Sequence, residues 1–535
     1  MRLARFAALV FACSTAVTAA PPVDPDMLAK ISDQGFNHGE VIETAAYLAD
    51  QIGGRMTNSP AMRKAESWTQ DRFRSWGLAN VHKEGFEFGR GWWIEAASVQ
   101  MVAPRPIMLR SIPVAWTPPT AGALTAPIIV APLRRERDFA LWHGKLAGKI
   151  VLVTLPTDPK DATTPSFRRA SDEDLRKLND YRQPSFDPGA ADRTLKRRKF
   201  AEQLDQFLKA EGAVAWARMS YRENSLVTGE GSLYKVGHTP ALPGVELAAE
   251  DYRRLARLAK IGPVTLRIDS NVHYDDSDTK AYNIIAEIPG SDPKAGYVMA
   301  GAHLDSWVAG DGAADNGAGS SMIMEAARIL ARSGVKPKRT IRFVLWAGEE
   351  EGLLGSAAYI AQHFVTRPPE TDPDKLAFLT PSSIETWPVT PLPGFKDLAA
   401  YFNIDNGSGK LRGLYAEGNF GVVPIFKEWL APFASMGANT VVAEPTGGTD
   451  HVLMQRIGLP GFQFIQDDLD YSSTVHHSNV DTFDHLRAAD MRQGSVILAT
   501  LLLDAANAEK PLPRLQLPTL PRPTNPFQYD DPDQN

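Results

Sequence analysis

The sequence has little cysteine and no long apolar run. Cys13 is the single cysteine among 535 residues, and it lies close to the amino terminus. If the first residues are removed as a leader, the mature chain has no thiol, which excludes disulfides and cysteine-ligated metal sites. No segment approaches the roughly 20 apolar residues that a transmembrane helix needs. Any metal must therefore be bound by oxygen and nitrogen atoms of Asp, Glu and His side chains.

Neither sign of charge dominates the chain. There are 57 Lys and Arg against 63 Asp and Glu residues, which gives a formal net charge of −6. Proteins that bind nucleic acids usually carry an excess of basic residues. We therefore expect neither DNA nor RNA as a partner.

The first 20 residues have the pattern of a secretory signal peptide. Arg2 and Arg5 precede a short apolar run, and the small residues Ala19 and Ala20 offer a cleavage site. A membrane anchor is an alternative, but the run is too short. A lipoprotein signal at Cys13 is another, but the residues before it are poorly suited. We expect an exported protein, periplasmic or extracellular, with no membrane span after the leader is removed.

The rest of the chain divides by the spacing of its apolar residues. Residues 26–77 have helical spacing and predict two helices, and short β-rich runs such as 127–133 and 148–155 follow. After residue 269, strands alternate with helices, which indicates an α/β fold whose mostly parallel central sheet has helices on both faces. We predict a catalytic domain split between 26–105 and 269–510, an inserted β-rich domain over 106–268, and a proline-rich tail, strapped to the protein or disordered, over 511–535.

Residues 167–209 within the predicted insertion are densely charged. They include the runs RRASDEDLRKL and LKRRKFAEQLDQF. A phosphate-binding patch is one interpretation of this stretch. Because both signs of charge are interleaved along it, a solvated helical face is favoured.

Acidic and histidine residues follow the predicted strands of the carboxyl-terminal half. The richest segments are GAHLDSWVAGDGAADNGAGS and FVLWAGEEEGLLGS. In open α/β sheets, sites form at the carboxyl ends of the strands. A single His or Glu at such a place is usually an ordinary polar residue, so the hypothesis rests on the joint placement of the candidates. The candidates are His303, Asp305, Asp315, Glu349, Glu350, Asp405 and His477.

The first rich segment offers an imidazole and a rigidly held carboxylate. His303 suits a metal ligand, and Asp305 beside it suits the acceptor of the other ring N–H. Asp315 and Asp311 both compete for a place between two cations. We favour Asp315 because it directly precedes a helix start in a glycine-rich loop.

The second rich segment offers three consecutive glutamates. Side chains of adjacent residues diverge, so one of Glu349 and Glu350 can bind metal while the other deprotonates a water. Glu351 is interpreted as a surface residue before the next helix. Other hydrolase and nucleotide-binding patterns fail: HExxH and GxSxG are absent, and GSGK at 407–410 lacks the leading glycine of a phosphate loop.

Five strings resemble the co-catalytic zinc exopeptidase family, which includes bacterial zinc aminopeptidases. The strings are HLDSW, DNGAG, EEEGLLGS, NIDNGSG and VHHSNVDTF. The resemblance covers nearly the whole mature chain, and the β-rich insertion is similar to a protease-associated domain. It implies a zinc exopeptidase fold and hydrolysis of terminal peptide bonds in short peptides or dipeptides.

The resemblance also implies the role of each candidate. Asp315 would bridge two Zn²⁺ ions, with His303 and Asp405 completing one site and Glu350 and His477 the other. Co²⁺ or Mn²⁺ would also suit these donors.

Glu349 is implied as the general base, which takes a proton from a water shared by the two ions. His477 is preferred over His476 because the last ligand of the family precedes a small hydroxyl residue and an acidic residue followed by Thr. Tyr471, just ahead of the two histidines, could line the pocket, stabilise an oxyanion or only pack.

Two other functions occur on related folds. Some relatives are receptors that lack metal ligands, and others are glutaminyl cyclases that use a single zinc. Every ligand position is filled here, and the complete bridging set favours two metals. The motifs do not separate aminopeptidase, carboxypeptidase and dipeptidase activity. Relatives commonly dimerise, which allows a homodimer here.

Overall fold

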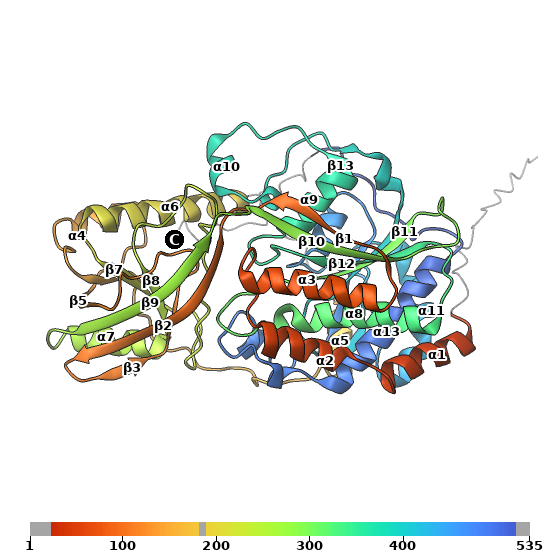
Figure 1. Cartoon of the computed structure of the whole chain (residues 1–535), viewed down its shortest axis with the longest axis horizontal. Coiled ribbons are helices and arrows are strands. Elements are labelled where there is room, and N and C mark those ends of the chain that lie inside the picture. Colours follow the sequence, from red (N-terminus) through yellow and green to blue (C-terminus); the bar gives the residue numbers. More distant parts are fainter. Residues whose placement is uncertain (1–22, 181–188, 521–535) are drawn as a thin grey trace, which may run out of the picture.

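The computed structural model describes residues 23–180 and 189–520. Figure 1 shows two lobes side by side, each built on an eight-stranded sheet. The predicted leader lies outside the described residues, and so does the last part of the predicted tail, residues 521–535.

The first sheet has the strand order β1-β10-β12-β11-β15-β18-β16-β17. Its four central strands, β12, β11, β15 and β18, are parallel, whereas β10, β1 and β16 join through antiparallel pairs. Strand β17 pairs in parallel with β16. The bounds are β1 Ala79–Glu87, β10 Lys280–Ile288, β11 Tyr297–His303, β12 Thr340–Trp346, β15 Leu398–Asn403, β16 Leu411–Tyr415, β17 Thr440–Val442 and β18 Gly461–Gln466.

Helices cover both faces of this sheet because its central strands are apolar on both sides. In β11, Val298 and Ala300 face one core, and Met299 faces the other. The first face carries α1 (Pro25–Phe36), α2 (Val41–Ala46), α3 (Pro60–Ser75), α8 (Ala318–Ser333), α11 (Val423–Leu430) and α13 (Ala488–Asn507). The second carries α9 (Leu354–His363) and α12 (His451–Gln455). The predicted α/β architecture is confirmed.

The amino-terminal segment has one helix more than expected. The predicted pair corresponds to α2, which continues as a wider turn over Tyr47–Ile52, and to α3. Ser59 caps α3 by accepting a hydrogen bond from the Met62 backbone N–H, and Pro60 occupies the first turn. Helix α1 precedes them.

The second sheet has the strand order β3-β2-β9-β5-β6-β7-β8-β4. Its bounds are β2 Gly91–Ala103, β3 Ile107–Leu109, β4 Ser111–Pro113, β5 Leu124–Val130, β6 Ile150–Leu152, β7 Ala215–Met219, β8 Gly244–Leu247 and β9 Thr265–Asp275. Apolar side chains of α7 (Ala249–Ala259) cover one face, and those of α4 (Phe139–Trp142) and α6 (Ala190–Ala210) cover the other. Strands were expected at β5 and β6, and both are present.

Strands β2 and β9 form the long ribbon that leads from the first lobe into the second (Figure 1). They pair from Gly91 and Asp275 to Ala103 and Thr265, so the second sheet uses residues on both sides of the predicted insertion 106–268. The division into domains stays a prediction.

The charged stretch folds into α5 (Asp172–Lys177) and α6. Leu208 is the single fully buried residue of α6, which agrees with a solvated helical face. Residues 181–188 of this stretch lie outside the described ranges.

The described part of the tail is strapped along β15. The Leu512 backbone N–H donates to the Ala399 carbonyl oxygen, and the Arg514 guanidinium donates to the Phe395 and Leu398 carbonyl oxygens.

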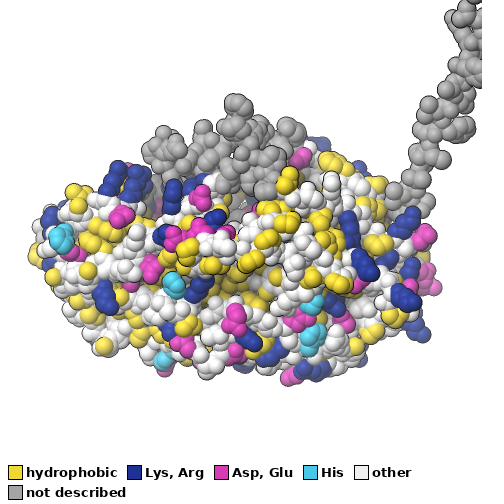
Figure 2. All heavy atoms as spheres, turned by 90° about the horizontal axis from the view of Figure 1, so that it is seen from above, with side chains coloured by type: hydrophobic (Ala, Val, Ile, Leu, Met, Phe, Trp, Pro, Cys, Tyr) yellow, Lys and Arg dark blue, Asp and Glu magenta, His cyan; other side chains and the backbone are white. Residues whose placement is uncertain are grey.

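In the view of Figure 1, α10 (Pro373–Phe378) and β13 (Val365–Thr366) lie above the first sheet, and β13 pairs with β14 (Thr390–Pro391). Within residues 23–180 and 189–520, none of the helices has the length and apolar character to cross a bilayer. Acidic and basic side chains are interspersed over the face shown in Figure 2.

Candidate metal centre

The predicted residues meet at the carboxyl edge of the parallel strands. His303 is the last residue of β11, the two glutamates follow β12, and Asp405 follows β15. Asp315 lies in the irregular turn Ala313–Gly317 before α8, and His477 follows the turn Tyr471–Val475. Because β11, β12 and β15 are adjacent and parallel, their ends bring these side chains together.

One group of donors surrounds His303. Its Nε2 atom lies 3.3 Å from Asp315 Oδ1 and 3.3 Å from Asp405 Oδ1. Glu349 Oε2 lies 3.9 Å from the same nitrogen. The spacing of His303, Asp315 and Asp405 suits ligands of a single cation.

A second group surrounds His477. Its Nε2 atom lies 2.9 Å from Glu350 Oε2 and 3.4 Å from Asp315 Oδ2. The two groups thus share Asp315, which faces each histidine with a different oxygen. His476 stacks on His477 at 3.7 Å between ring centroids, and its Nε2 is 3.8 Å from Asp315 Oδ2. His477 is the nearer of the two and also contacts Glu350.

Asp305 supports the site through a different atom than expected. His303 Nδ1 lies 2.9 Å from the Asp305 backbone carbonyl oxygen, but 3.8 Å from its carboxylate oxygen. The carboxylate instead accepts the Glu350 backbone N–H at 3.1 Å. Asp305 therefore links the end of β11 to the loop that carries both glutamates.

The loop that presents Asp315 is held by groups that the sequence analysis did not select. Asp481 accepts the backbone N–H groups of Ala314 at 2.6 Å and Asp315 at 3.0 Å. Asn316 donates to the Ile404 carbonyl oxygen at 2.9 Å and so ties this loop to the end of β15. Asp481 lies in the string VHHSNVDTF, so its motif was visible but its role was not.

Arg55 is the second group missed from the sequence. Its guanidinium is fully buried and donates to the carbonyl oxygens of Leu304 at 2.7 Å and Gly312 at 2.6 Å. It also donates to the Asp311 carbonyl oxygen at 2.9 Å. Arg55 thereby fixes the loop between His303 and Asp315. Its partners are main-chain atoms, which leave no side-chain pattern to recognise.

Glu351 corrects one expectation. It was interpreted as a surface residue, but it is only 5 % exposed, and its carboxylate accepts a hydrogen bond from Thr57 Oγ1 at 2.8 Å. Helix α9 begins at Leu354, so Glu351 lies in the buried turn between β12 and this helix. Burial, together with the nearby Asp305 carboxylate, raises the pKa of Glu351 well above its ordinary value.

Burial and close charges shift the acid–base behaviour of the centre. Burial raises the pKa of Glu350 to about 7, although His477 opposes the shift. Burial disfavours a charged His477, but the carboxylates of Glu350 and Glu230 outweigh it and raise its pKa to about 12. Burial acts against ionisation of Asp315, yet His303 and His477 together lower its pKa.

The donor set fits a bound cation on structural grounds. Asp315 Oδ2, Glu350 Oε1 and Asp405 Oδ1 are buried oxygens without a hydrogen-bond partner in the described residues. Desolvated carboxylates are costly unless paired or bound to metal. Five carboxylates, those of Asp305, Asp315, Glu349, Glu350 and Asp405, lie around two imidazoles, so positive charge is needed to balance them.

A small hollow is lined by Trp307, Asp315, Glu350 and His477, and so opens on the donors. Tyr471 lies edge-on to His476 at 5.2 Å between centroids, and burial, with Asp315 and Asp405 nearby, raises the pKa of its hydroxyl well above the ordinary value. The role of Tyr471 stays a prediction.

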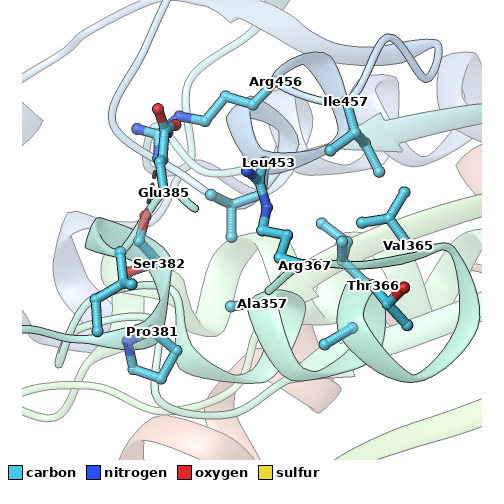
Figure 3. Close-up of a pocket in the computed structure, with 13 residues that line it drawn as sticks. Ala357, Val365, Thr366, Arg367, Pro381, Ser382, Glu385, Leu453, Arg456 and Ile457 are labelled. Carbon is cyan, nitrogen blue, oxygen red and sulfur yellow. Dashed lines mark hydrogen bonds and ion pairs between the residues drawn. The ribbon is translucent and has the colours of Figure 1, made fainter. Parts of the chain in front are cut away.

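A hollow of about 340 Å³ lies between α9, β13 and α12. Figure 3 shows that its floor is apolar, with Val365, Leu453 and Ile457, while Arg456 reaches across to Ser382. None of the predicted site residues lines it.

Known proteins are similar to all or part of this chain. The family model for peptidase family M28 matches residues 283–502. Carboxypeptidase Q of Rattus norvegicus is 26 % identical over 480 residues, covering 88 % of this chain and 86 % of the relative. Leupeptin-inactivating enzyme 1 of Streptomyces exfoliatus is 44 % identical over 87 residues, covering 16 % of this chain and 20 % of the relative.

Solved structures agree with the fold. A peptidase M28 precursor from Shewanella amazonensis has a TM-score of 0.63 at 22 % identity, covering 92 % of this chain and 98 % of that one. A zinc aminopeptidase from Bacillus subtilis has a TM-score of 0.55 at 21 % identity, with coverage of 89 % and 97 %. These matches confirm the predicted resemblance to the zinc exopeptidases: the chain is a metallo-exopeptidase that is similar to peptidase family M28 over residues 283–502.

Proposed function

We propose that this chain is an exported dinuclear zinc exopeptidase that hydrolyses the terminal peptide bonds of short peptides or dipeptides. One observation carries the proposal: two His-centred donor groups share the two oxygens of Asp315. A carboxylate that serves two cations is typical of two-metal hydrolytic sites. The relatives support peptide substrates, since their names include carboxypeptidase Q and a zinc aminopeptidase.

The ligand sets follow from the two groups. His303, Asp405 and Asp315 would hold one zinc ion, and His477, Glu350 and Asp315 the other. When bound, such ions supply Lewis acidity, which polarises a peptide carbonyl and acidifies water. The oxygen-rich donors would also accept Co²⁺ or Mn²⁺.

Glu349 is proposed as the group that moves the proton. Its carboxylate lies beside the first group, 3.9 Å from His303 Nε2, in the loop that follows the end of β12 at Trp346. Burial, together with Asp405 and Asp450, raises its pKa well above the ordinary value of a glutamate. A base with a raised pKa can hold the proton taken from the attacking water and then release it to the leaving amine.

Metal content and product analysis test the proposal together. Protein purified without chelator is expected to hold about two zinc ions per chain by mass spectrometry. A panel of short peptides with free and blocked termini, run with and without chelator, is expected to lose single terminal residues only when metal is present. The blocked series then reports whether the amine or the carboxylate end is recognised.

Other outcomes would identify the alternatives. One zinc per chain with cyclisation of amino-terminal glutamine would indicate a glutaminyl cyclase and contradict the proposal. Export is tested separately by amino-terminal sequencing of secreted protein, which should begin close to Ala20. Gel filtration with light scattering tests whether the chain forms the homodimer that the resemblance allows.

A further inference from the structure

The segment 218–230 of the second lobe reaches into the metal centre. Glu230 lies between β7 and β8, more than two hundred residues before the histidine that it contacts. Its Oε1 atom lies 2.8 Å from His477 Nδ1, on the side of the ring opposite to the cluster. A carboxylate from the second sheet therefore contacts a side chain that faces Asp315 and Glu350.

The contact constrains the imidazole chemically. A histidine that donates its Nδ1–H to a carboxylate keeps the lone pair of Nε2 for a cation, and its ring plane is fixed. Nε2 is the atom that faces Asp315 and Glu350. His477 has a φ of +59°, a backbone region that L-residues rarely adopt, and its ring contacts Glu230 from outside its own loop.

Glu230 is itself held by the second sheet. Arg218 of β7 donates to the Glu230 carbonyl oxygen at 2.8 Å and to the Glu246 carboxylate of β8 at 2.6 Å. Tyr221 donates its hydroxyl to Glu230 Oε1 at 3.0 Å. The main chain of Glu230 is thus tied to β7, and its carboxylate accepts a second hydrogen bond from Tyr221 beside its contact with His477.

The neighbouring residues join the same two loops a second time. The Val227 backbone N–H donates to Asn479 Oδ1 at 2.8 Å, and the Asn479 backbone N–H donates to the Val227 carbonyl oxygen at 3.0 Å. This reciprocal pair lies two residues from His477. The loop of the histidine is therefore docked on the second lobe by both its backbone and its ring.

We propose that Glu230 is a positioning residue for the zinc ligand His477, so that the second lobe completes the metal centre. This inference rests on the proposed function, since it assigns the partner of one proposed ligand. Glu230 acts through the imidazole and touches neither substrate nor reacting water. Loss of such a partner typically weakens metal binding about 10–100-fold.

Chelator competition on the purified full chain tests this directly. Two substitutions are compared with the unchanged protein: Glu230→Ala removes the acceptor, and Glu230→Gln keeps an acceptor oxygen but removes the charge. We expect one of the two zinc ions to be released at about 10–100-fold lower chelator concentration in Glu230→Ala, with a smaller change in Glu230→Gln. The other ion should keep its affinity.

A matched control removes a similar pair from the same sheet. Glu95 contacts His273 Nε2 at 2.6 Å on the β2–β9 ribbon, and neither residue contacts the donors of the metal centre. Glu95→Gln should leave both zinc affinities unchanged. Co²⁺-loaded protein gives an activity-independent readout, because the visible absorption of one ion should change in Glu230→Ala and not in the control.

The outcomes separate this inference from the proposed function. If the unchanged protein holds no zinc pair, the proposed function fails. If it holds the pair and Glu230→Ala releases both ions like the unchanged protein, only the role of Glu230 is overturned. If Glu230→Ala does not fold, the chelator titration of Glu230→Gln decides. Thermal unfolding of the metal-free forms then shows whether Glu230→Gln is folded like the unchanged protein.

Discussion

A single substitution distinguishes the proposed role of Glu349 as a base from the role of a metal ligand. Glu349→Gln keeps the size of the side chain but cannot take up a proton. We expect bound zinc to be retained and kcat to fall by about two to four orders of magnitude, because a positioned base contributes about this much. Mass spectrometry of the metal and initial rates on one peptide measure both effects. Undiminished kcat would remove Glu349 from the role of base, and Asp311→Asn, whose residue lies outside both donor groups, is the control.

Asp481 holds the loop of the shared carboxylate without touching the proposed cations. Asp481→Asn leaves one acceptor for two backbone N–H groups, so one buried donor loses its partner. We expect the metal-free protein to lose about 1–3 kcal/mol of unfolding free energy. Urea unfolding measures this, with Asp484→Asn, an exposed aspartate of the same loop, as the neutral comparison.

The residues predicted from the sequence are those that a strand end or a glycine-rich loop presents. His303, Asp315 and Asp405 follow strands or precede a helix, so a one-dimensional pattern locates them. Arg55 and Glu230 act through contacts made by distant segments, and neither lies in a recognisable motif. Glu351 was misinterpreted because a charged residue before a helix is usually solvated, and burial by the amino-terminal segment overrides that rule.

Helix α13 carries a buried acid that makes stability depend on pH. Asp504 is 2 % exposed, and burial raises its pKa from 3.8 to about 7 in the folded protein. Between these values the folded state binds more protons than the unfolded chain, so stability falls as pH rises. The contribution is fully present below about pH 4 and is lost by about pH 7.

Asp504→Asn should remove this dependence. The amide keeps an oxygen that can accept the Val23 backbone N–H, which Asp504 Oδ1 accepts at 2.7 Å. We expect the variant to gain on the order of a few kcal/mol relative to the unchanged protein between pH 4 and pH 7. Unfolding curves across this range measure the difference. A constant difference, or the same gain in the exposed control Asp26→Asn, would contradict the assignment.

The elements of the first sheet were the easiest to predict. Strands β10, β11, β12, β15 and β18 are apolar runs bounded by turns, and the helices between them have a clear spacing. Helix α1 was missed because only Ile31 and Gly35 of its residues are fully buried, which leaves a weak apolar pattern. The path of the tail along β15 depends on backbone contacts of Arg514, which no periodicity reveals.

Removal of metal should lower the stability of the whole molecule. Ligands that bind only the folded state stabilise it, and here they also offset buried carboxylates that have no partner. We expect chelator to lower the unfolding temperature by about 5–10 °C, and added zinc to restore it. Differential scanning calorimetry measures the shift. Asp315→Asn should respond little to chelator, and a full response in that variant would show that the stabilising ion binds elsewhere.

Residues 168–179, which follow β6, lie against the first lobe. Leu175 of α5 packs with Val442 and Ile465 of the first sheet, and the Asn179 side-chain amide donates to the Val441 carbonyl oxygen at 3.2 Å. The second lobe is therefore held to the first by this segment as well as by the crossings at residues 88–90 and 276–279, where the Phe88 backbone N–H donates to the Thr279 carbonyl oxygen at 2.9 Å. Because Glu230 and Val227 join the loop of His477 directly, a displacement of the second lobe would also displace this imidazole. Retention of the ion at His477 should thus depend on how the two lobes are seated against each other.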